Sequence, residues 1–208
     1  DASQVWQYSV ASLALPSVNP PSVADGTVYM AAGQQGLATM FAFNAADGGL
    51  VFRSPMTSQW EHYLAPTIGP QGDYTNAGTY GGLYGFAFSG QQLFFRSLEQ
   101  QSAWTPAADA DRVYAYTGHT LTVVNPIPGA VDATIADVTF QNYIYEVGGS
   151  AVLGAPGSVF AAAYANTFLN GGGIGNRLLR FDVPSRSVAW QITGNYPTTP
   201  GYKAGVLY

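Results

Sequence analysis

A nine-residue pattern returns five times along this sequence. Each copy ends in an aromatic residue and four of the five begin with proline; the copies occupy residues 21–29, 66–74, 106–114, 152–160 and 200–208. Their aromatic ends are separated by 45, 40, 46 and 48 residues. Self-similarity at a nearly constant interval predicts that the chain is built from structural repeats.

A second recurring element follows the first four copies and consists of a strand, a tight turn and another strand. Its clearest example is 42–52, where Asp47, Gly48 and Gly49 separate two apolar runs. Asp-Gly supplies the positive φ that a tight β-turn requires. The corresponding segments are 85–95, 123–133 and 179–190. Each repeat is therefore predicted to contain four short strands.

Four-stranded units at intervals of roughly 40 to 50 residues predict an all-β fold, a β-propeller of antiparallel blades. No long stretch keeps the apolar spacing of an amphipathic helix without Gly or Pro interrupting it. We expect residues 1–208 to form a single propeller domain or a fragment of one. The predicted units lie near 11–56, 57–98, 99–139 and 140–193, with a partial unit at 194–208.

The two ends of the sequence predict an incomplete ring. Residues 3–7 (SQVWQ) resemble residues 187–191 (SVAWQ), so the chain opens on what we expect to be an outermost strand. It closes at Tyr208, inside the first hairpin of a fifth unit. We expect about four full blades with partial terminal ones. The remaining blades of a longer protein, or a second chain, would complete the ring.

Composition limits the possible partners. Only 9% of residues are charged and the net charge is −5, so no positive stripe is available and nucleic acid is excluded as a partner. The absence of cysteine excludes disulfides, thiolate metal sites and a cysteine nucleophile. No segment has the roughly 18 unbroken apolar residues of a membrane span. Low charge with many aromatic residues is typical of periplasmic or secreted bacterial β-proteins, which is the localisation we expect.

The second element of each unit resembles the blade motif of the PQQ-like β-propeller repeat family, Ala-x-Asp-x-x-Thr-Gly-Lys-x-x-Trp. That family includes the quinoprotein dehydrogenases and the barrel-assembly propeller lipoprotein of the bacterial outer membrane. The resemblance implies structural roles, in which Asn or Asp caps the turn, glycine adopts positive φ and the aromatic residue docks between blades. These roles fall on Asn44, Gly48, Phe52, Asn125, Gly129, Asp182 and Trp190. The vicinal cysteine pair common in the dehydrogenases is missing, and we expect neither a cofactor nor a metal site.

The densest group of functional side chains is Trp60, Glu61, His62 and Tyr63, in the link between the first and second units. A carboxylate beside an imidazole could share a proton or bind a metal, but neighbours on a strand point to opposite faces. Stacking of a ligand on the two aromatic rings is a second possibility. Simple packing is the third, and the sequence leaves all three open.

A mixed polar and aromatic stretch leads into the fourth unit and contains Gln141, Tyr143 and Tyr145. Together with the Gly-rich loop at 166–176 it could form a sugar- or peptide-binding surface. The alternative is a strand whose tyrosines pack on neighbouring blades. The loop itself lacks the following helix and the lysine of a phosphate cradle.

These features predict a non-catalytic extracytoplasmic propeller, a binding or scaffold module that engages a protein or glycan partner through its rim loops. The alternative is part of a propeller enzyme, such as a quinoprotein-like oxidoreductase or a polysaccharide lyase, whose active site lies partly outside this chain. Low charge and only two histidines favour the first hypothesis over the second.

Overall fold

The computed structural model describes residues 3–9, 19–59, 63–100, 104–118, 120–137, 150–163, 177–194, 196 and 198–208. These residues form β-strands, turns and irregular segments. Helices are absent from them, so the described part of the chain offers no helical membrane span.

The strands form four four-stranded antiparallel sheets and one terminal hairpin. The first sheet contains β1 (Ser22–Ala24), β2 (Thr27–Gln34), β3 (Leu37–Asn44) and β4 (Leu50–Met56). The second contains β5 (Thr67–Gly69), β6 (Gly72–Asn76), β7 (Gly82–Phe86) and β8 (Gln92–Ser97). The third contains β9 (Ala107–Ala108), β10 (Val113–Tyr116), β11 (Thr120–Val124) and β12 (Val131–Ala136). The fourth contains β13 (Ala151–Leu153), β14 (Ser158–Ala163), β15 (Arg177–Asp182) and β16 (Ser187–Thr193), and the hairpin pairs β17 (Tyr202–Lys203) with β18 (Val206–Leu207).

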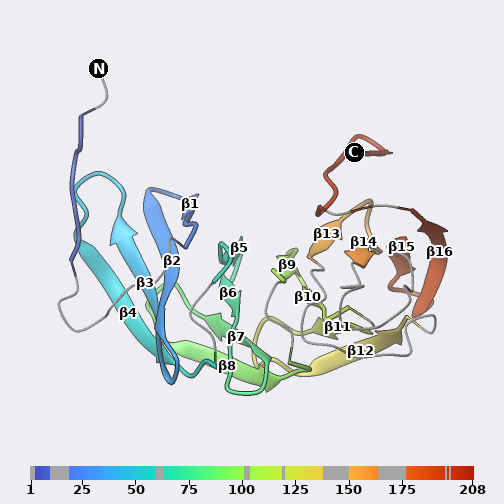
Figure 1. Ribbon diagram of the computed structural model, residues 1–208, viewed down its shortest axis with the longest axis horizontal. Helices are drawn as coiled ribbons and strands as arrows, with labels where there is room; N and C mark the ends of the chain where they lie inside the picture. Colours follow the sequence, from blue (N-terminus) through green and yellow to red (C-terminus); the bar gives the residue numbers. More distant parts are fainter. Residues whose placement is uncertain are drawn as a thin grey trace.

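The four sheets stand side by side in an open arc (Figure 1). In each sheet the strands lie in chain order, with the short first strand on the concave inner side and the fourth strand on the convex outer side. The inner strands β1, β5, β9 and β13 contact one another in sequence around the arc. The predicted all-β fold with four full units in an unclosed ring is confirmed.

Local geometry repeats along with the strands. The hairpins β1–β2 and β17–β18 turn through Asp25–Gly26 and Ala204–Gly205, with positive φ at both residues of each pair, as a two-residue type I′ turn requires. The pairing of the third and fourth strands shifts register once in every sheet, at Phe43, Phe86, Val124 and Phe181. Such a bulge increases local twist, so all four outer strands bend at the same place.

The hydrophobic core lies between successive sheets. Met40 and Phe52 of the first sheet pack with Tyr84 and Phe86 of the second. The second and third sheets share a cluster that contains Phe94 and Val113, and the third and fourth share the largest cluster, which contains Tyr116 and Phe181. Because both faces of a middle sheet are covered, burial does not alternate along its inner strands: β6, β7 and β10 are buried along their whole lengths.

The outer ends of the sheets are joined by a repeated contact that we call the aromatic–glycine clasp. The ring of Phe52 lies on Gly90 in the β7–β8 turn, and the ring of Phe94 lies on Gly129 in the β11–β12 turn. Both glycines have positive φ, 85° and 78°. A Cβ atom at either would fall 2.6 Å or 2.3 Å from the ring, so only glycine permits this approach.

A hydrogen bond completes each clasp, made by the residue two positions after the aromatic. The Ser54 hydroxyl donates to the Gly90 carbonyl at 2.5 Å. Arg96 donates from Nε and Nη2 to the Gly129 carbonyl at 3.0 and 2.8 Å. Each clasp therefore combines burial of an aromatic ring with satisfaction of a turn carbonyl.

The junction between the third and fourth sheets lacks this clasp. Ala133 stands where the other outer strands place an aromatic residue, and the positive-φ position of the β15–β16 turn is Arg186, at 53°. A side chain is tolerated there because no ring has to lie on the turn. Loss of the ring and loss of the glycine thus occur together.

A clasp of the same kind also closes the outward face of the first sheet. Residues 3–9 form no strand, but the ring of Trp6 lies on Gly48 in the β3–β4 turn, 2.6 Å from the place of a Cβ atom. Trp6 Nε1 donates to the Ala45 carbonyl at 2.9 Å, and Tyr8 packs on Phe43. The segment therefore occupies the place that the outer strand of a preceding sheet would take.

Each sheet has two distinct ends. Gln34 pairs with Leu37 and Ala38 with Met56, so the connection from second to third strand and the connection to the next sheet leave from the same end. We call this the loop-bearing end. The short turns between first and second and between third and fourth strands lie at the opposite, turn end.

Candidate binding surface

A buried ion pair sits at the loop-bearing end between the third and fourth sheets. Arg177 Nε donates to Asp137 Oδ2 at 2.8 Å, and Arg177 Nη2 contacts the same oxygen. Their side chains are 4% and 1% exposed. Asp137 immediately precedes residues 138–149, and Arg177 immediately follows residues 164–176. The pair therefore joins the bases of the two longest connections of the chain.

Tyr116 completes this cluster. Its hydroxyl lies 3.1 Å from Asp137 Oδ2 and 2.8 Å from the Gly118 carbonyl oxygen. Burial, followed by the negative charge of Asp137, raises the pKa of Tyr116 well above its ordinary value. The phenol accordingly stays protonated as a hydrogen-bond donor near neutral pH.

A second polar contact lies at the same end. It joins the connection between β4 and β5 to the connection between β8 and β9. Gln100 Nε2 donates to Gln59 Oε1 at 2.7 Å. Gln59 immediately precedes residues 60–62, and Gln100 immediately precedes residues 101–103. Successive connections are thus tied at their bases by side-chain contacts.

Most of the residues predicted to bind a ligand lie outside the described part of the chain: Trp60, Glu61, His62, Gln141, Tyr143 and Tyr145. Tyr63 is described and is 4% exposed, within the core shared by the first and second sheets. Its backbone N–H donates to Asn19 Oδ1 at 3.1 Å. A role in ligand binding for Tyr63, and for the six predicted residues outside the described part of the chain, stays a prediction.

The residues predicted to form the repeat motif lie in the β3–β4, β11–β12 and β15–β16 hairpins. Oδ1 of Asn44, Asn125 and Asp182 accepts a backbone N–H two or three residues ahead, which is an Asx-type turn. The Ser185 hydrogen bonds lower the pKa of Asp182. Gly48 and Gly129 have positive φ, and Phe52 lies in the first clasp. Trp190 projects from the outward face of the fourth sheet. Its cross-strand partner on β15 is Arg180.

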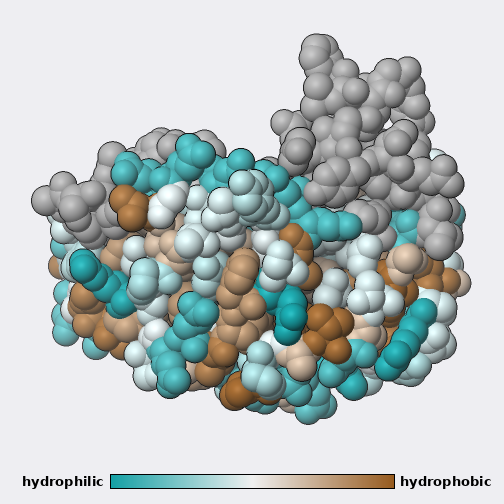
Figure 2. All heavy atoms as spheres, turned by 90° about the horizontal axis from the view of Figure 1, so that it is seen from below, coloured by the Kyte–Doolittle hydropathy of each residue, from teal (hydrophilic) through white to brown (hydrophobic). Residues whose placement is uncertain are grey.

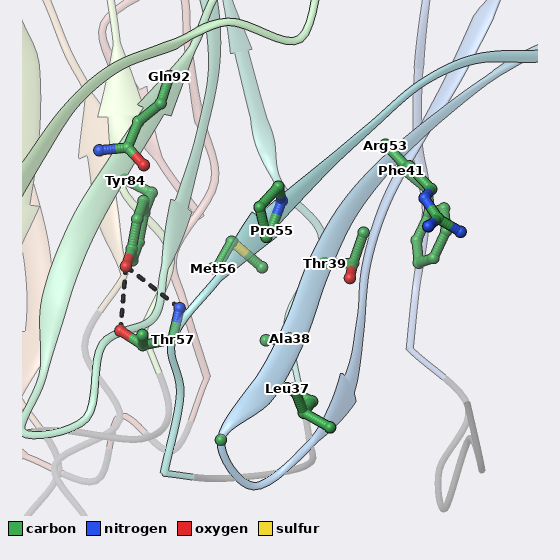
Figure 3. Close-up of a pocket in the computed structure, with 11 residues that line it drawn as sticks. Leu37, Ala38, Thr39, Phe41, Arg53, Pro55, Met56, Thr57, Tyr84 and Gln92 are labelled. Atoms are coloured by element: carbon green, nitrogen blue, oxygen red, sulfur yellow. Dashed lines mark hydrogen bonds between the residues drawn. The ribbon is translucent and has the colours of Figure 1, made fainter. Parts of the chain in front are cut away.

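An open groove of about 710 Å³ runs beside the outer strand of the first sheet (Figure 3). Leu37, Thr39 and Phe41 lie on one side of β4, and Tyr84, whose hydroxyl contacts Thr57, lies on the other. Arg53 is its charged lining residue. Within the described ranges no three His, Cys, Asp or Glu residues cluster closely enough to hold a metal ion.

One buried carboxyl lies apart from these surfaces. Asp73 of β6 is 0% exposed, and neither carboxyl oxygen has a hydrogen-bond partner among the described residues. Ile68 and Phe86 lie opposite it on the neighbouring strands. Burial raises the pKa of Asp73 to about 8, so the group is largely protonated at neutral pH.

Comparison with known proteins identifies the fold. No protein-family model matches the sequence, and no curated protein matches it. Solved structures do match, including BamB from Moraxella catarrhalis, with a TM-score of 0.56, 12% identity and coverage of 88% of this chain and 67% of that one. The computationally designed Ika4 protein matches with a TM-score of 0.61 and 13% identity, over 88% of this chain and 99% of that one. Kuenenia stuttgartiensis hydrazine synthase matches with a TM-score of 0.61 and 11% identity, over 84% of this chain and 48% of that one. The fold is a β-propeller.

The propeller spans only part of its natural neighbours, 67% of the BamB chain and 48% of the hydrazine synthase chain. Its convex side carries separate apolar patches between polar side chains (Figure 2).

Sequence reasoning missed the polar residues that organise the loop-bearing end. Asp137 and Arg177 are 40 residues apart and belong to no repeated motif. Asp73 did carry a signal, because the equivalent positions in the other four copies are Val28, Val113, Val159 and Leu207. A single carboxyl in an otherwise apolar column indicates an unusual environment.

Proposed function

We propose that this propeller is a non-catalytic binding or scaffold module that engages a protein or glycan partner at its loop-bearing end. The observation that carries the proposal is the buried pair Asp137–Arg177, which fixes the bases of connections 138–149 and 164–176 beside each other. A buried ion pair adds little net stability, and its best-attested use is to specify one arrangement. Here the pair fixes the point where one long connection leaves the third sheet beside the point where another enters β15.

The connection at 138–149 brings Gln141, Tyr143 and Tyr145. Tyrosine offers a flat apolar ring with a polar tip, which suits both sugar rings and peptide side chains. The link between Gln59 and Tyr63 contains Trp60, Glu61 and His62 in its sequence. This composition favours recognition by stacking and neutral hydrogen bonds over ionic capture.

Family and localisation belong to the same proposal. The likeness to BamB and the blade motif around Asn44 and Gly48 support membership of the PQQ-like repeat family. Low charge, abundant aromatics and the absence of cysteine support a periplasmic or secreted location. Fractionation of the native organism with an antibody against the chain would test the location.

The binding proposal is tested with a panel of defined oligosaccharides and a displayed random-peptide library. We expect a hit whose affinity falls at least tenfold in the Tyr143→Ala/Tyr145→Ala variant, since each stacked ring contributes on the order of 1 kcal/mol. Phe88→Ala is the matched control, because this exposed aromatic lies in the β7–β8 turn at the opposite end. Equal losses in both variants would refute the proposed surface.

The competing enzyme hypothesis has its own readout. Incubation with PQQ and calcium, followed by absorbance and thermal unfolding, should leave this propeller unchanged. A saturable rise in melting temperature would favour the quinoprotein-like alternative.

A further inference from the structure

A tight turn at the loop-bearing end of the second sheet presents an exposed aromatic side chain. The connection from β6 to β7 contains Gly78-Thr79-Tyr80-Gly81, and Tyr80 is 73% exposed. The Gly81 N–H donates to the Gly78 carbonyl, and the two glycines have positive φ, 108° at Gly78 and 89° at Gly81. Glycine adopts such a φ without the strain that a side chain would bring. The two glycines therefore leave Tyr80 at the tip of a narrow turn.

The neighbouring connections hold this turn on both sides. Ser58 pairs with Gly78 in a parallel bridge, and the Gly78 N–H donates to the Thr57 carbonyl at 2.8 Å. On the other side, a Cβ atom at Gly81 would fall 2.7 Å from Cα of Gln100. Tyr80 thus projects from a backbone that is fixed in advance, which lowers the entropic cost of capturing a ligand.

Two amide side chains lie beside the turn and supply hydrogen-bonding groups. Gln59 follows Ser58, Gln100 lies against Gly81, and the contact from Gln100 Nε2 to Gln59 Oε1 at 2.7 Å joins them. This contact uses one end of each amide. Gln59 Nε2 keeps its donor capacity and Gln100 Oε1 its acceptor capacity, and neither atom makes a further hydrogen bond to the described residues.

The ring and the amide pair together fit a sugar. The apolar face of a sugar ring can lie on a tyrosine ring. Neighbouring sugar hydroxyls are both donors and acceptors, so they match an amide donor beside an amide acceptor. Peptide anchors fill enclosed, desolvated pockets, whereas Tyr80 stands exposed on its turn. Glu99, next to Gln100, already accepts a hydrogen bond from the Thr117 hydroxyl at 3.2 Å.

We propose that a neutral glycan binds at this turn, with one sugar ring stacked on Tyr80 and its hydroxyls hydrogen-bonded to Gln59 Nε2 and Gln100 Oε1. The inference rests on the proposed function and deepens it, because the site lies at the same loop-bearing end and specifies a carbohydrate as the partner. None of the three side chains is charged, so the site favours neutral sugars over acidic ones.

Binding of neutral oligosaccharides to the whole chain tests the proposal. The probes are maltohexaose, cellohexaose, laminarihexaose and chitohexaose, screened by saturation-transfer NMR and measured by titration calorimetry. We expect at least one probe to bind, about tenfold more weakly to Tyr80→Ala and within about twofold of wild type to Tyr80→Phe, which keeps the ring. Gln100→Leu should weaken binding about threefold or more, because one hydrogen-bonding end is lost. Tyr208→Ala, at another tyrosine that is 78% exposed, should bind as wild type does.

Circular dichroism and thermal unfolding establish that each variant is folded, and Gln100→Leu carries the test if Tyr80→Ala is not. Failure of all the probes to bind at millimolar concentration overturns the glycan assignment. Binding that Tyr80→Ala and Gln100→Leu leave intact overturns it as well. Binding that falls in Tyr143→Ala/Tyr145→Ala but not in Tyr80→Ala would overturn this site and leave the proposed module standing, so the two proposals can fail separately.

Discussion

At the scale of single residues, the core between the first and second sheets contains a carboxyl group that apolar packing does not favour. Asp73 is fully buried between Ile68 and Phe86. A carboxyl in such a place keeps its proton, because charging it without a partner is costly. Its raised pKa of about 8 makes folding stability depend on pH.

We expect the free energy of unfolding to fall as pH rises between about 4 and 8. Below pH ~4 both states hold the proton; between ~4 and 8 only the unfolded state releases it, which favours unfolding by about 1.4 kcal/mol per pH unit. Asp73→Asn removes this dependence, so its stability relative to wild type should rise by about 4 kcal/mol from pH 5 to pH 8 in urea titrations. Asp132→Asn, at a carboxylate 40% exposed, is the control. Parallel pH curves for wild type and Asp73→Asn would contradict the expectation.

At the scale of elements, the outer hairpins are held by rings that cross from one sheet to the next. In three of the four outer hairpins an aromatic residue follows the positive-φ position by four residues: Gly48 to Phe52, Gly90 to Phe94 and Arg186 to Trp190. The third hairpin has Ala133 at this place. In the second sheet this spacing lets Gly90 receive the ring of Phe52 from the first sheet while Phe94 lies on Gly129 of the third sheet. The β7–β8 hairpin therefore takes part in two junctions.

Gly90→Ala should cost more stability than Gly26→Ala, although both glycines have positive φ. Nothing lies within 4 Å of a Cβ atom at Gly26, whereas at Gly90 it would lie 2.6 Å from the Phe52 ring. We expect about 1 kcal/mol for the backbone at either site and about 2 kcal/mol more at Gly90 for displacing the ring. Urea unfolding measures both, and equal losses would show that the ring moves freely.

The elements themselves were largely predictable from the sequence. The nine-residue copies coincide with the first hairpin of each sheet, and the Asp47-Gly48 turn lies in the β3–β4 hairpin. The second outer hairpin was harder, since its shorter turn hid the equivalence of Gly90 and Phe94. Which glycine receives which ring was not predictable, because the two belong to different repeats. The Asp137–Arg177 pair was missed for a related reason: both residues lie where strands end, beyond the repeated pattern.

At the scale of the whole molecule, the hydrophobic clusters that join the four sheets lie between neighbouring sheets in the described part of the chain. Three separate clusters fill the three junctions. In such a linear array a local defect loosens the adjacent units and leaves distant ones intact. Stability is therefore expected to vary along the arc.

Phe52→Ala should expose this nearest-neighbour behaviour. The change leaves a cavity at the first junction and should cost about 3 kcal/mol. Hydrogen exchange followed by mass spectrometry should show faster exchange in β3, β4, β7 and β8, with β14 and β15 unchanged. Uniform acceleration across all four sheets would indicate that the arc unfolds as one cooperative body.

The last junction of the arc has a chemistry of its own: Ala133 and Arg186 replace the ring and the glycine at the turn end, and a buried ion pair lies at the loop-bearing end. A sheet duplicated or exchanged at either of the first two junctions would find an aromatic ring on one side and a turn glycine on the other, as in the existing clasps. A unit transplanted into the last junction would have to bring Asp137 and Arg177 together. Growth of such a chain by internal duplication is therefore open at its beginning and restricted towards its end.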